Sequence, residues 1–209
     1  LKRTPHIAFN LLEEFHGVAV YDQHIVAYLE LMKLPYTGCN PRGIFVANDK
    51  ALCKKVLQYH RIRAPRFLVV PRGKAPALGK SRLEFPMFVK SASEHASVGI
   101  SQASVVRDEA QLRERVEFVH RTIGTAALCE EFIEGRELTI GVLGNKRLET
   151  APVWEVFLDG LPPGAPRILT SRIKWDLAYQ KQVGLRTGPA DLDEETRARI
   201  QRLGRRIYR

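Results

Sequence analysis

The sequence has 209 residues, of which 44% are hydrophobic and 27% are charged. This composition is typical of a folded globular chain that is long enough for one or two hydrophobic cores. The formal net charge of +10 favours an anionic partner, and a nucleotide or an acidic substrate would satisfy it as well as a nucleic acid. Because the arginines and lysines are not interleaved with aromatic residues, and no zinc-finger or RNA-binding signature is present, we expect no nucleic-acid partner.

The cysteines and the hydrophobic runs exclude further classes. Cys39, Cys53 and Cys129 are widely spaced and contain no C-x-x-C pair, which argues against a zinc site or a disulfide scaffold. The sequence has no run of about eighteen apolar residues and no charged segment leading into an apolar one. We therefore expect a cytoplasmic protein with no membrane partner.

The N-terminal segment reads as the end of an α/β unit. Residues 6–12 predict a short strand, and His16 follows soon after it, where ligand loops often lie. Residues 23–32 place their apolar side chains on one helical face, and residues 34–38 turn the chain into an extended segment. Because open α/β domains contain more strands than this, we expect the first part of that domain to be missing.

A helix should follow, with Asn48 as its N-cap and Leu52, Val56 and Tyr59 on one face. Lys50 then lies in the first helical turn. A solvated lysine is the alternative to a ligand contact at this position.

The next segments predict a strand that presents a lysine to a flexible loop. Residues 67–70 predict a strand, and residues 71–83 are a loop rich in proline and glycine. The apolar residues 85–89 predict a second strand that ends at Lys90. The loop 91–99 is rich in serine, alanine and glycine, so its backbone amides can approach phosphate oxygens. A solvated strand end is the alternative.

Two amphipathic helices are predicted in the second half of the sequence, one after Asp108 and one at the C-terminal end. Asp108, with Gln111 three residues later, predicts a helix start that precedes a stripe formed by Leu112, Val116, Val119 and Ile123. We expect this helix to back a sheet. The final helix begins near Glu194 and carries Ile200, Leu203 and Ile207 on one side and arginines on the other. It must bury that stripe.

An acidic hinge separates two further strands. Residues 126–133 predict a strand interrupted by Glu130 and Glu131, and Gly135 breaks it before the next strand at 137–140. Such a hinge can face an adenine ring, with Glu137 accepting hydrogen bonds from ribose hydroxyls. The backbone groups that would pair with the adenine edge belong to Glu131, Phe132 and Ile133. A β-turn with exposed acids is the alternative.

Residues 139–143 and 148–156 predict a hairpin closed by a turn at 144–145. The segment 159–166 is too rich in proline and glycine for regular structure.

Five motifs in this order give the sequence a specific resemblance. It resembles the D-alanine–D-alanine ligase branch of the ATP-grasp ligases from about residue 9 to 143, through NLLEEFHG, LELMKLPYTG, NDKALCKKVL, FVKSASEHASVGIS and EEFIEGRELTIGVL. The match thins beyond residue 143, although SRIKW occupies the place of a loop with a phosphate-facing lysine. The resemblance implies an α+β ATP-grasp fold: the end of a preceding α/β domain at 1–47, a complete small subdomain at 48–135 and an incomplete large subdomain at 136–209.

The resemblance also implies a reaction and a set of roles. ATP and two magnesium ions would activate a carboxylate as an acyl phosphate, and an amine would then displace phosphate to form an amide; neutralising charge is the main requirement of such phosphoryl transfer. Lys50 and Lys90 would hold phosphate oxygens, Ser97 would close over the transferred phosphate, and Glu94 would brace this lid. Lys174 would add a cation from a mobile loop, or would be a surface lysine. The residues matching the family's substrate segment are His16 and Asp22, and the hinge contributes Glu130, Glu131, Phe132, Ile133 and Glu137.

Two departures concern the substrate. Where dipeptide-forming members of the family read E-G-S-S-V-G, this sequence has Ala96 in place of the first serine, and Trp175 occupies the position of a tyrosine. Each unmade buried hydrogen bond costs about 1–3 kcal/mol, which makes D-alanine a doubtful substrate. Small carboxylate and amine substrates of some kind remain the expected partners, and a homodimer remains an open alternative.

A third departure concerns magnesium. The family's ligands are an Asp, a Glu and an Asn on late strands, and the sequence has no matching Glu-x-Asn strand. We therefore expect the metal ligands beyond Arg209, and a fragment cut at both ends that binds nucleotide weakly and does not turn over. Two other functions stay open: a nucleotide-binding module that has lost catalysis, and a basic RNA-binding protein.

Overall fold

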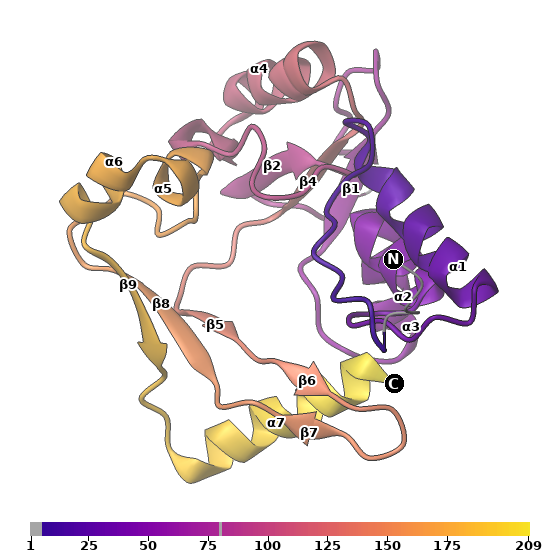
Figure 1. Cartoon of the computed structure of the whole chain (residues 1–209). Coiled ribbons are helices and arrows are strands. Elements are labelled where there is room, and N and C mark those ends of the chain that lie inside the picture. The colour runs from indigo at the N-terminus through magenta and orange to yellow at the C-terminus, as the bar shows by residue number, and fades with distance from the viewer. Residues whose placement is uncertain (1–5, 80) are drawn as a thin grey trace. The chain divides into compact units, whose positions relative to one another are not determined.

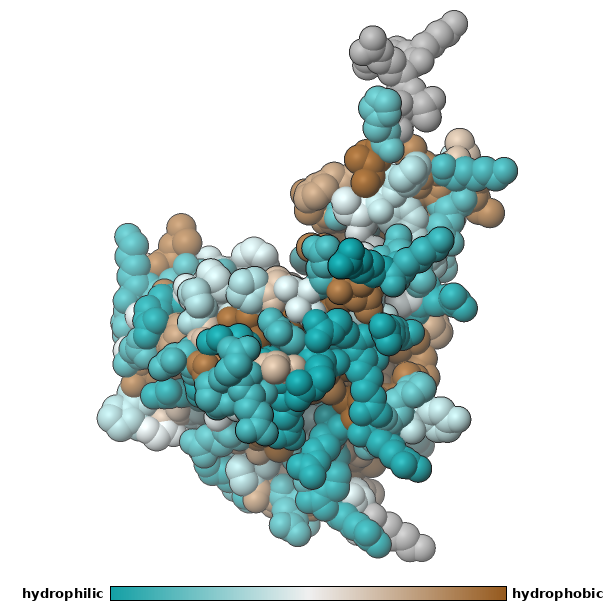
Figure 2. Space-filling model, turned by 90° about the horizontal axis from the view of Figure 1, so that it is seen from below, coloured by the Kyte–Doolittle hydropathy of each residue, from teal (hydrophilic) through white to brown (hydrophobic). Residues whose placement is uncertain are grey.

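The computed structural model describes residues 6–79 and 81–209. They fall into two compact units, Leu1–Phe132 and Ile133–Arg209, each of which combines helices with antiparallel strands. Figure 1 shows the elements of both units. Within the described residues no helix is both long and apolar enough to cross a lipid bilayer. The face shown in Figure 2 is largely hydrophilic, with hydrophobic residues in small separate patches.

A short 3-10 helix and three α-helices dominate the start of the first unit, where a strand and an extended segment were predicted. The short 3-10 helix η1 (Ala19–Tyr21) leads into α1 (Asp22–Leu31), which confirms the predicted helix. The segment expected to be extended forms α2 (Pro41–Asn48), because Pro41 suits a first helical turn and the Asn40 side chain accepts a hydrogen bond from the Gly43 amide. The third helix is α3 (Lys50–Tyr59).

Asn48 does not cap α3, contrary to the prediction. It is the last residue of α2, and its side chain is buried and donates a 2.8 Å hydrogen bond to Oδ1 of Asp22. Asp49 caps α3 instead, since its Oδ1 accepts from the Leu52 amide at 2.9 Å. Lys50 is therefore the first residue of α3, as predicted.

The strand predicted at residues 6–12 is reduced to one bridge between Ala8 and Tyr36. The Ala8 amide donates to the Pro35 carbonyl at 2.8 Å, and the Thr37 amide donates to the Ala8 carbonyl at 3.0 Å. Phe9 and Leu11 are exposed. A strand needs a neighbour along its length, and here the neighbouring chain turns into α2 after a few residues.

A four-stranded antiparallel sheet forms the centre of the first unit, with the order β1-β4-β2-β3. Its strands are β1 (Phe67–Val70), β2 (Met87–Ser91), β3 (Val105–Val106) and β4 (Ala127–Glu131). The strands predicted at 67–70, 85–90 and 126–133 are thereby confirmed. The described residues of the connection, 71–79 and 81–83, form no helix or strand, as the proline and glycine content of the segment predicts.

One face of this sheet is the hydrophobic core and the other carries the lysine. Side chains alternate along a strand, so Met87 and Val89 point to one face and Phe88 and Lys90 to the other. The first face packs on α4 (Glu109–Phe118), whose buried Leu112 and Val116 belong to the same core cluster. As predicted, Asp108 caps α4, because its Oδ1 accepts from the Gln111 amide at 2.8 Å. The helix continues as the π-helix η3 (Val119–Ile123).

The second unit has a three-stranded sheet in the order β5-β8-β9 and a separate two-stranded pair. The strands are β5 (Glu137–Thr139), β8 (Trp154–Leu158) and β9 (Leu185–Pro189), and β6 (Val142–Leu143) with β7 (Glu149–Thr150). Since β5 pairs with β8 and β6 with β7, the predicted hairpin is confirmed. The irregular loop predicted at 159–166 is also confirmed, and it leads to two short helices, α5 (Ser171–Trp175) and α6 (Leu177–Gln182).

The final helix, α7 (Glu194–Tyr208), packs differently from the prediction. It packs through the buried Gly204, where an added Cβ would lie 3.2 Å from Cγ2 of Ile140. Leu203 and Ile207, expected to be buried, are 41% and 51% exposed. The absence of a side chain at Gly204 lets the backbone approach β6, so the contact lies beside the predicted apolar stripe rather than on it.

Candidate functional site

Lys90 lies at the end of β2 beside a buried carboxylate. In the register of the sheet Lys90 is opposite Leu128, and Phe88 is opposite Glu130, so Lys90 and Glu130 are diagonal neighbours on the same face. The Lys90 Nζ lies 2.5 Å from Oε1 of Glu130, and Lys54 Nζ from α3 lies 2.7 Å from the other oxygen. Both carboxylate oxygens therefore face a lysine, and a direct contact of Glu130 with a ligand stays a prediction.

Lys50 completes this group, which we call the lysine cluster: Lys50, Lys54 and Lys90 around Glu130. Its Nζ donates to the Glu94 carbonyl at 2.5 Å. Burial lowers the pKa of Lys50, the Lys90 ammonium lowers it further, and the carboxylates of Glu94, Glu130 and Asp49 act in the opposite direction. The structure thus brings together the two lysines predicted to hold phosphate oxygens.

The loop 91–99 is attached to the sheet at its start. Ser91 Oγ accepts hydrogen bonds from the amides of Ser93 and Glu94 at 3.2 and 2.9 Å, and its contact with Thr125 Oγ1 is 2.8 Å. At the tip, Ala96 and Ser97 adopt left-handed φ values of 51° and 62°. Non-glycine residues rarely adopt this conformation. In proteins generally, residues that do adopt it are found often at ligand-binding loops.

The other end of the loop is held by Arg115 of α4, a residue that was not predicted from the sequence. Its guanidinium donates to the Gly99 carbonyl and, at 2.9 Å, to Ser104 Oγ. The guanidinium carbon also lies 4.3 Å from the Phe118 ring centroid. Burial lowers the pKa of Arg115. An arginine three residues after Leu112, on the apolar side of a helix, is the signal that would have found it.

Gly99 permits a close approach of the loop to η3. It has φ 71°, and an added Cβ would lie 2.7 Å from Cδ1 of Ile123. Together the contacts at Ser91 and Gly99 fix both ends of the loop and leave Glu94 and Ser97 between them.

The acidic hinge uses part of its hydrogen-bonding capacity inside the first unit. The Glu131 amide donates to the Arg66 carbonyl at 3.0 Å, and the Phe132 amide donates to the Pro86 carbonyl at 3.2 Å. The Glu131 carboxylate pairs with Arg66, and a hydrogen bond from the Arg66 backbone is the main cause that lowers the Glu131 pKa. The amides of Glu131 and Phe132 are therefore already used within the first unit. Of the three predicted amide donors to the adenine edge, the Ile133 amide is the one that stays a prediction.

Two aromatic rings lie on the lysine-bearing face. The Phe132 and Phe88 rings stack with centroids 6.5 Å apart, and Lys90 Nζ lies 5.5 Å from the Phe88 centroid. An apolar surface beside clustered cations is the arrangement that a nucleotide needs, with a flat base at one end and phosphates at the other.

The predicted substrate residues lie among the N-terminal helices. His16 is exposed in a turn closed by hydrogen bonds between Phe15 and Val18, and its ring lies 4.3 Å from that of Phe15. Asp22 is buried, and its Oδ1 accepts from the Asn48 side chain and from the Gln23 amide. These bonds give Asp22 a structural task, and its contact with a substrate stays a prediction.

The remaining predicted residues belong to the second unit. Glu137 lies on β5 and is exposed, and Lys174 lies on α5 and is also exposed. Nearby protein atoms raise the pKa of the Glu137 carboxyl by displacing water, and the Lys174 ammonium acts in the opposite direction. The structure thus places Glu137 and Lys174 within electrostatic reach of each other. Their approach to the lysine cluster of the first unit stays a prediction.

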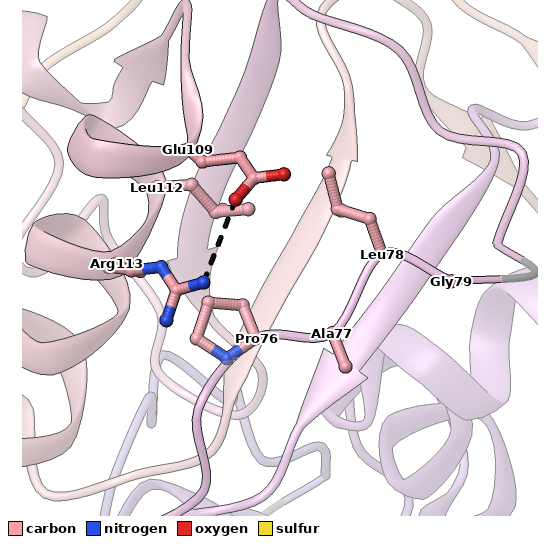
Figure 3. Close-up of a pocket in the computed structure, with 7 residues that line it drawn as sticks. All are labelled: Pro76, Ala77, Leu78, Gly79, Glu109, Leu112 and Arg113. Atoms are coloured by element: carbon pink, nitrogen blue, oxygen red, sulfur yellow. Dashed lines mark ion pairs between the residues drawn. The ribbon is translucent and has the colours of Figure 1, made fainter.

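Two cavities are lined by residues outside the lysine cluster. One, of about 270 Å³, lies between residues 76–79 and α4, and Figure 3 shows Glu109 and Arg113 paired on one side of it, with Pro76, Ala77, Leu78 and Gly79 on the other. None of the residues that line it was predicted to bind a ligand. A smaller pocket of about 40 Å³ in the second unit includes Glu137. Within residues 6–79 and 81–209, no three His, Cys, Asp or Glu side chains are grouped to hold a metal ion.

Comparison with known families identifies the family of this chain. The model of the family described as D-ala D-ala ligase C-terminus matches residues 56–209. The chain belongs to this family. Its ATP-grasp fold is thereby established, and the predicted resemblance is confirmed. The match also continues well past residue 143, where the motifs alone had thinned.

Individual relatives agree with the D-Ala–D-Ala ligase assignment. A D-alanine–D-alanine ligase of Solibacter usitatus is 34% identical over 196 residues, which is 93% of this chain and 56% of that protein. One of Streptococcus thermophilus is 34% identical over 148 residues, 69% of this chain and 41% of that protein. The chain thus spans about half the length of the curated relatives it matches.

Solved structures support the fold. The D-alanine–D-alanine ligase of Bacillus anthracis, in complex with ATP, superposes with a TM-score of 0.70 at 20% identity, covering 97% of this chain and 58% of that one. The ligase of Coxiella burnetii gives the same TM-score at 22% identity, covering 97% of this chain and 50% of that one.

Proposed function

We propose that the protein is an ATP-dependent carboxylate–amine ligase. ATP would transfer its terminal phosphoryl group to a carboxylate, giving an acyl phosphate and ADP, and an amine would then displace phosphate to form an amide. Family membership supports this reaction type, and so does the distribution of charge on the lysine-bearing face of the first sheet.

The observation that carries the proposal is the pairing of Lys50 with Lys90 beside the loop 91–99. Glu130 offsets only one of the three positive charges of the lysine cluster, so a net positive charge remains that a triphosphate would neutralise. Because both lysines are held by protein oxygens, little reorganisation is needed when the anion arrives. Phosphoryl transfer depends mainly on such positioning and charge neutralisation.

The other residues take roles around this centre. Phe132 would lie against the adenine, Ile133 would pair with its edge, and Glu137 would bind the ribose. Ser97 would close over the transferred phosphate with Glu94 bracing the loop, and Lys174 would add a further cation. We propose Mg²⁺ as the companion of ATP, because hard divalent ions bind phosphate and carboxylate oxygens. The division of the ATP-grasp fold at residues 47 and 135 is part of this proposal.

The substrates proposed are a small carboxylate and a small amine, with His16 and Asp22 as their contacts. Ala96 offers no hydroxyl, and Trp175, which is 72% exposed on α5, offers an indole N–H in place of a phenol. A site that has lost hydroxyl groups cannot orient an amino acid through them, so we do not propose D-alanine as the preferred substrate.

The test is a turnover assay with ATP, Mg²⁺ and a panel of small amino acids, hydroxy acids and amines. Phosphate release that requires both a carboxylate and an amine, together with an amide product in the mass spectrum, is the expected result. Phosphate release without an amide product would contradict the ligase assignment.

A second candidate is a nucleotide-binding module without turnover. Ala96 and Trp175 favour this candidate, because they remove hydroxyl groups that would bind a substrate while the lysine cluster is present. ATP binding by calorimetry without product in any combination of the panel would select this candidate over the ligase.

A further inference from the structure

We propose that Lys54 is a positioning residue for phosphate binding: it neutralises Glu130, so that the neighbouring Lys90 keeps an ammonium charge available to an anion. This inference rests on the proposed function, since phosphate is the anion concerned. Lys54 was not among the residues that the sequence predicted, although it lies four residues after Lys50 and therefore on the same side of α3.

The geometry gives one carboxylate two cations. Glu130 is 6% exposed and Lys54 8% exposed, so this pair is removed from solvent. Lys54 Nζ lies 2.7 Å from Oε2 of Glu130. It also donates a 3.2 Å hydrogen bond to the Pro65 carbonyl. Lys90 Nζ lies 2.5 Å from Oε1. The Lys90 side chain is the more exposed of the two lysines, at 22% against 11%, so it is the one that a ligand can reach.

The charges explain why the second cation matters. Glu130 and Lys90 alone would form a neutral, closed ion pair, and a phosphate would have to compete with the carboxylate for the ammonium. With Lys54 present the three groups carry one net positive charge, and the adjacent Lys50 adds a second. Removal of Lys54 halves this local charge. Buried ion pairs are sensitive to the loss of one partner, so the effect should exceed that of a surface lysine.

Four variants separate this role from simple stabilisation. Lys54→Met removes the charge and keeps a long side chain, and Lys54→Arg keeps the charge. Lys54→Met with Glu130→Gln removes one charge of each sign, so the local sum returns to its original value. Lys55→Met is the matched control, because Lys55 is the next residue on α3 and is exposed.

The first measurement is ATP affinity by calorimetry. We expect Lys54→Met to weaken binding by roughly tenfold or more, and Lys54→Arg and the double variant to recover most of that loss. Lys55→Met should change affinity less than about twofold. Unchanged affinity in Lys54→Met would overturn the inference. A double variant at least as weak as Lys54→Met would also overturn it, because it would show that the contact and not the charge is required.

The second measurement needs no nucleotide. The Lys90 amine is labelled with a water-soluble acylating reagent, and the labelled peptide is quantified by mass spectrometry. Without Lys54, the Glu130 carboxylate and the Lys90 ammonium form a closed ion pair that shields the amine, so labelling of Lys90 should slow in Lys54→Met and recover in the double variant, which lacks the carboxylate. A loosened fold would expose Lys90 and speed its labelling, which would identify a merely structural role.

The two measurements keep the inference and the proposed function apart. If the unsubstituted protein does not bind ATP but labelling of Lys90 slows as expected, the proposed function fails and the coupling of Lys54 to Lys90 stands. If it binds ATP and Lys54→Met changes neither affinity nor labelling, the inference fails and the proposed function stands.

Discussion

The two units hold their candidate ligand residues in different ways. In the first unit each lysine of the lysine cluster contacts a protein oxygen: Lys50 binds the Glu94 carbonyl, and Lys54 and Lys90 share Glu130. In the second unit Glu137 and Lys174 are exposed, and their mutual influence is electrostatic. The side chains of the first set are held by protein oxygens before a ligand binds, whereas those of the second set are exposed.

This difference suggests a division of labour. A preorganised cation pays its ordering cost during folding, so it contributes more to affinity than a mobile one. We therefore expect nucleotide affinity to depend mainly on the lysine cluster, and substrate choice and turnover to depend more on residues outside it. The predictions below test this division, beginning with the largest effect.

The largest expected loss of ATP affinity follows from replacement of Lys90. Lys90→Ala is expected to weaken ATP binding by roughly a hundredfold or more, because it removes a partly buried cation that lies beside the loop 91–99. Calorimetry measures the effect. Glu130 keeps Lys54 as its partner, so the melting temperature should change little. The exposed Lys55→Ala serves as the control, and ATP affinity that is equal in both variants would refute the role of Lys90.

A smaller effect is expected where the loop contacts η3. Gly99→Ala requires a left-handed φ of 71° and places a Cβ 2.7 Å from Ile123 Cδ1. We expect a loss of about 1–3 kcal/mol in the free energy of unfolding, measured by urea denaturation.

The control for this prediction is Gly73→Ala, because Gly73 has φ 79° with no heavy atom within 4 Å of the added Cβ. The difference between the two variants isolates the contact with Ile123. The added substitution Ile123→Val removes Cδ1 and should restore part of the loss in Gly99→Ala. Equal losses at Gly73 and Gly99 would show that the contact contributes nothing.

The sequence allowed prediction of the elements whose signals are local. Strands β1, β2 and β4 are short apolar runs bounded by turn residues, and Asp108 with Gln111 marks the start of α4. Helix α2 was missed because Pro41 and Gly43 resemble a turn, although proline suits a first helical turn. The strand at residues 6–12 was wrong, because the pattern does not show whether a neighbouring strand exists to pair with it.

The same limit applies to the candidate site. The positions of Lys50, Lys90 and the loop 91–99 followed from strand ends and a helix start, and the family resemblance reinforced them. Lys54 and Arg115 could not be assigned in this way, because their roles depend on partners distant in the sequence, Glu130 and Gly99. A charged residue on the apolar side of a predicted helix indicates that such a partner exists, but it does not identify the partner.

The two positions that differ from dipeptide-forming relatives, Ala96 and Trp175, should affect substrate choice more modestly. Trp175→Tyr together with Ala96→Ser restores two hydroxyls at positions where dipeptide-forming relatives have them. If the ligase assignment is correct, turnover with D-alanine should rise by about tenfold, as one recovered hydrogen bond would give, with ATP affinity unchanged. The panel assay measures this change, with Tyr28→Phe as a control that removes an exposed hydroxyl from α1. A change in ATP affinity without a change in D-alanine turnover would contradict the assignment of these two positions to substrate choice.

The smallest expected effect concerns pH and the ion pair at the hinge. Arg66 lowers the pKa of Glu131 below its ordinary value of 4.5, mainly through a backbone hydrogen bond. A carboxyl whose pKa is lower in the folded state stabilises the fold above about pH 4.5, and this contribution disappears as the pH falls through the folded-state pKa. Because the Arg66 side chain is half exposed, the contribution should not exceed about 1 kcal/mol. Urea denaturation at pH 7 and pH 3 should show that Glu131→Gln lowers the free energy of unfolding at pH 7 only. The exposed Glu84→Gln is the control and should show no such difference. An equal loss at both pH values would mean that the charge of Glu131 does not contribute to its contact with Arg66.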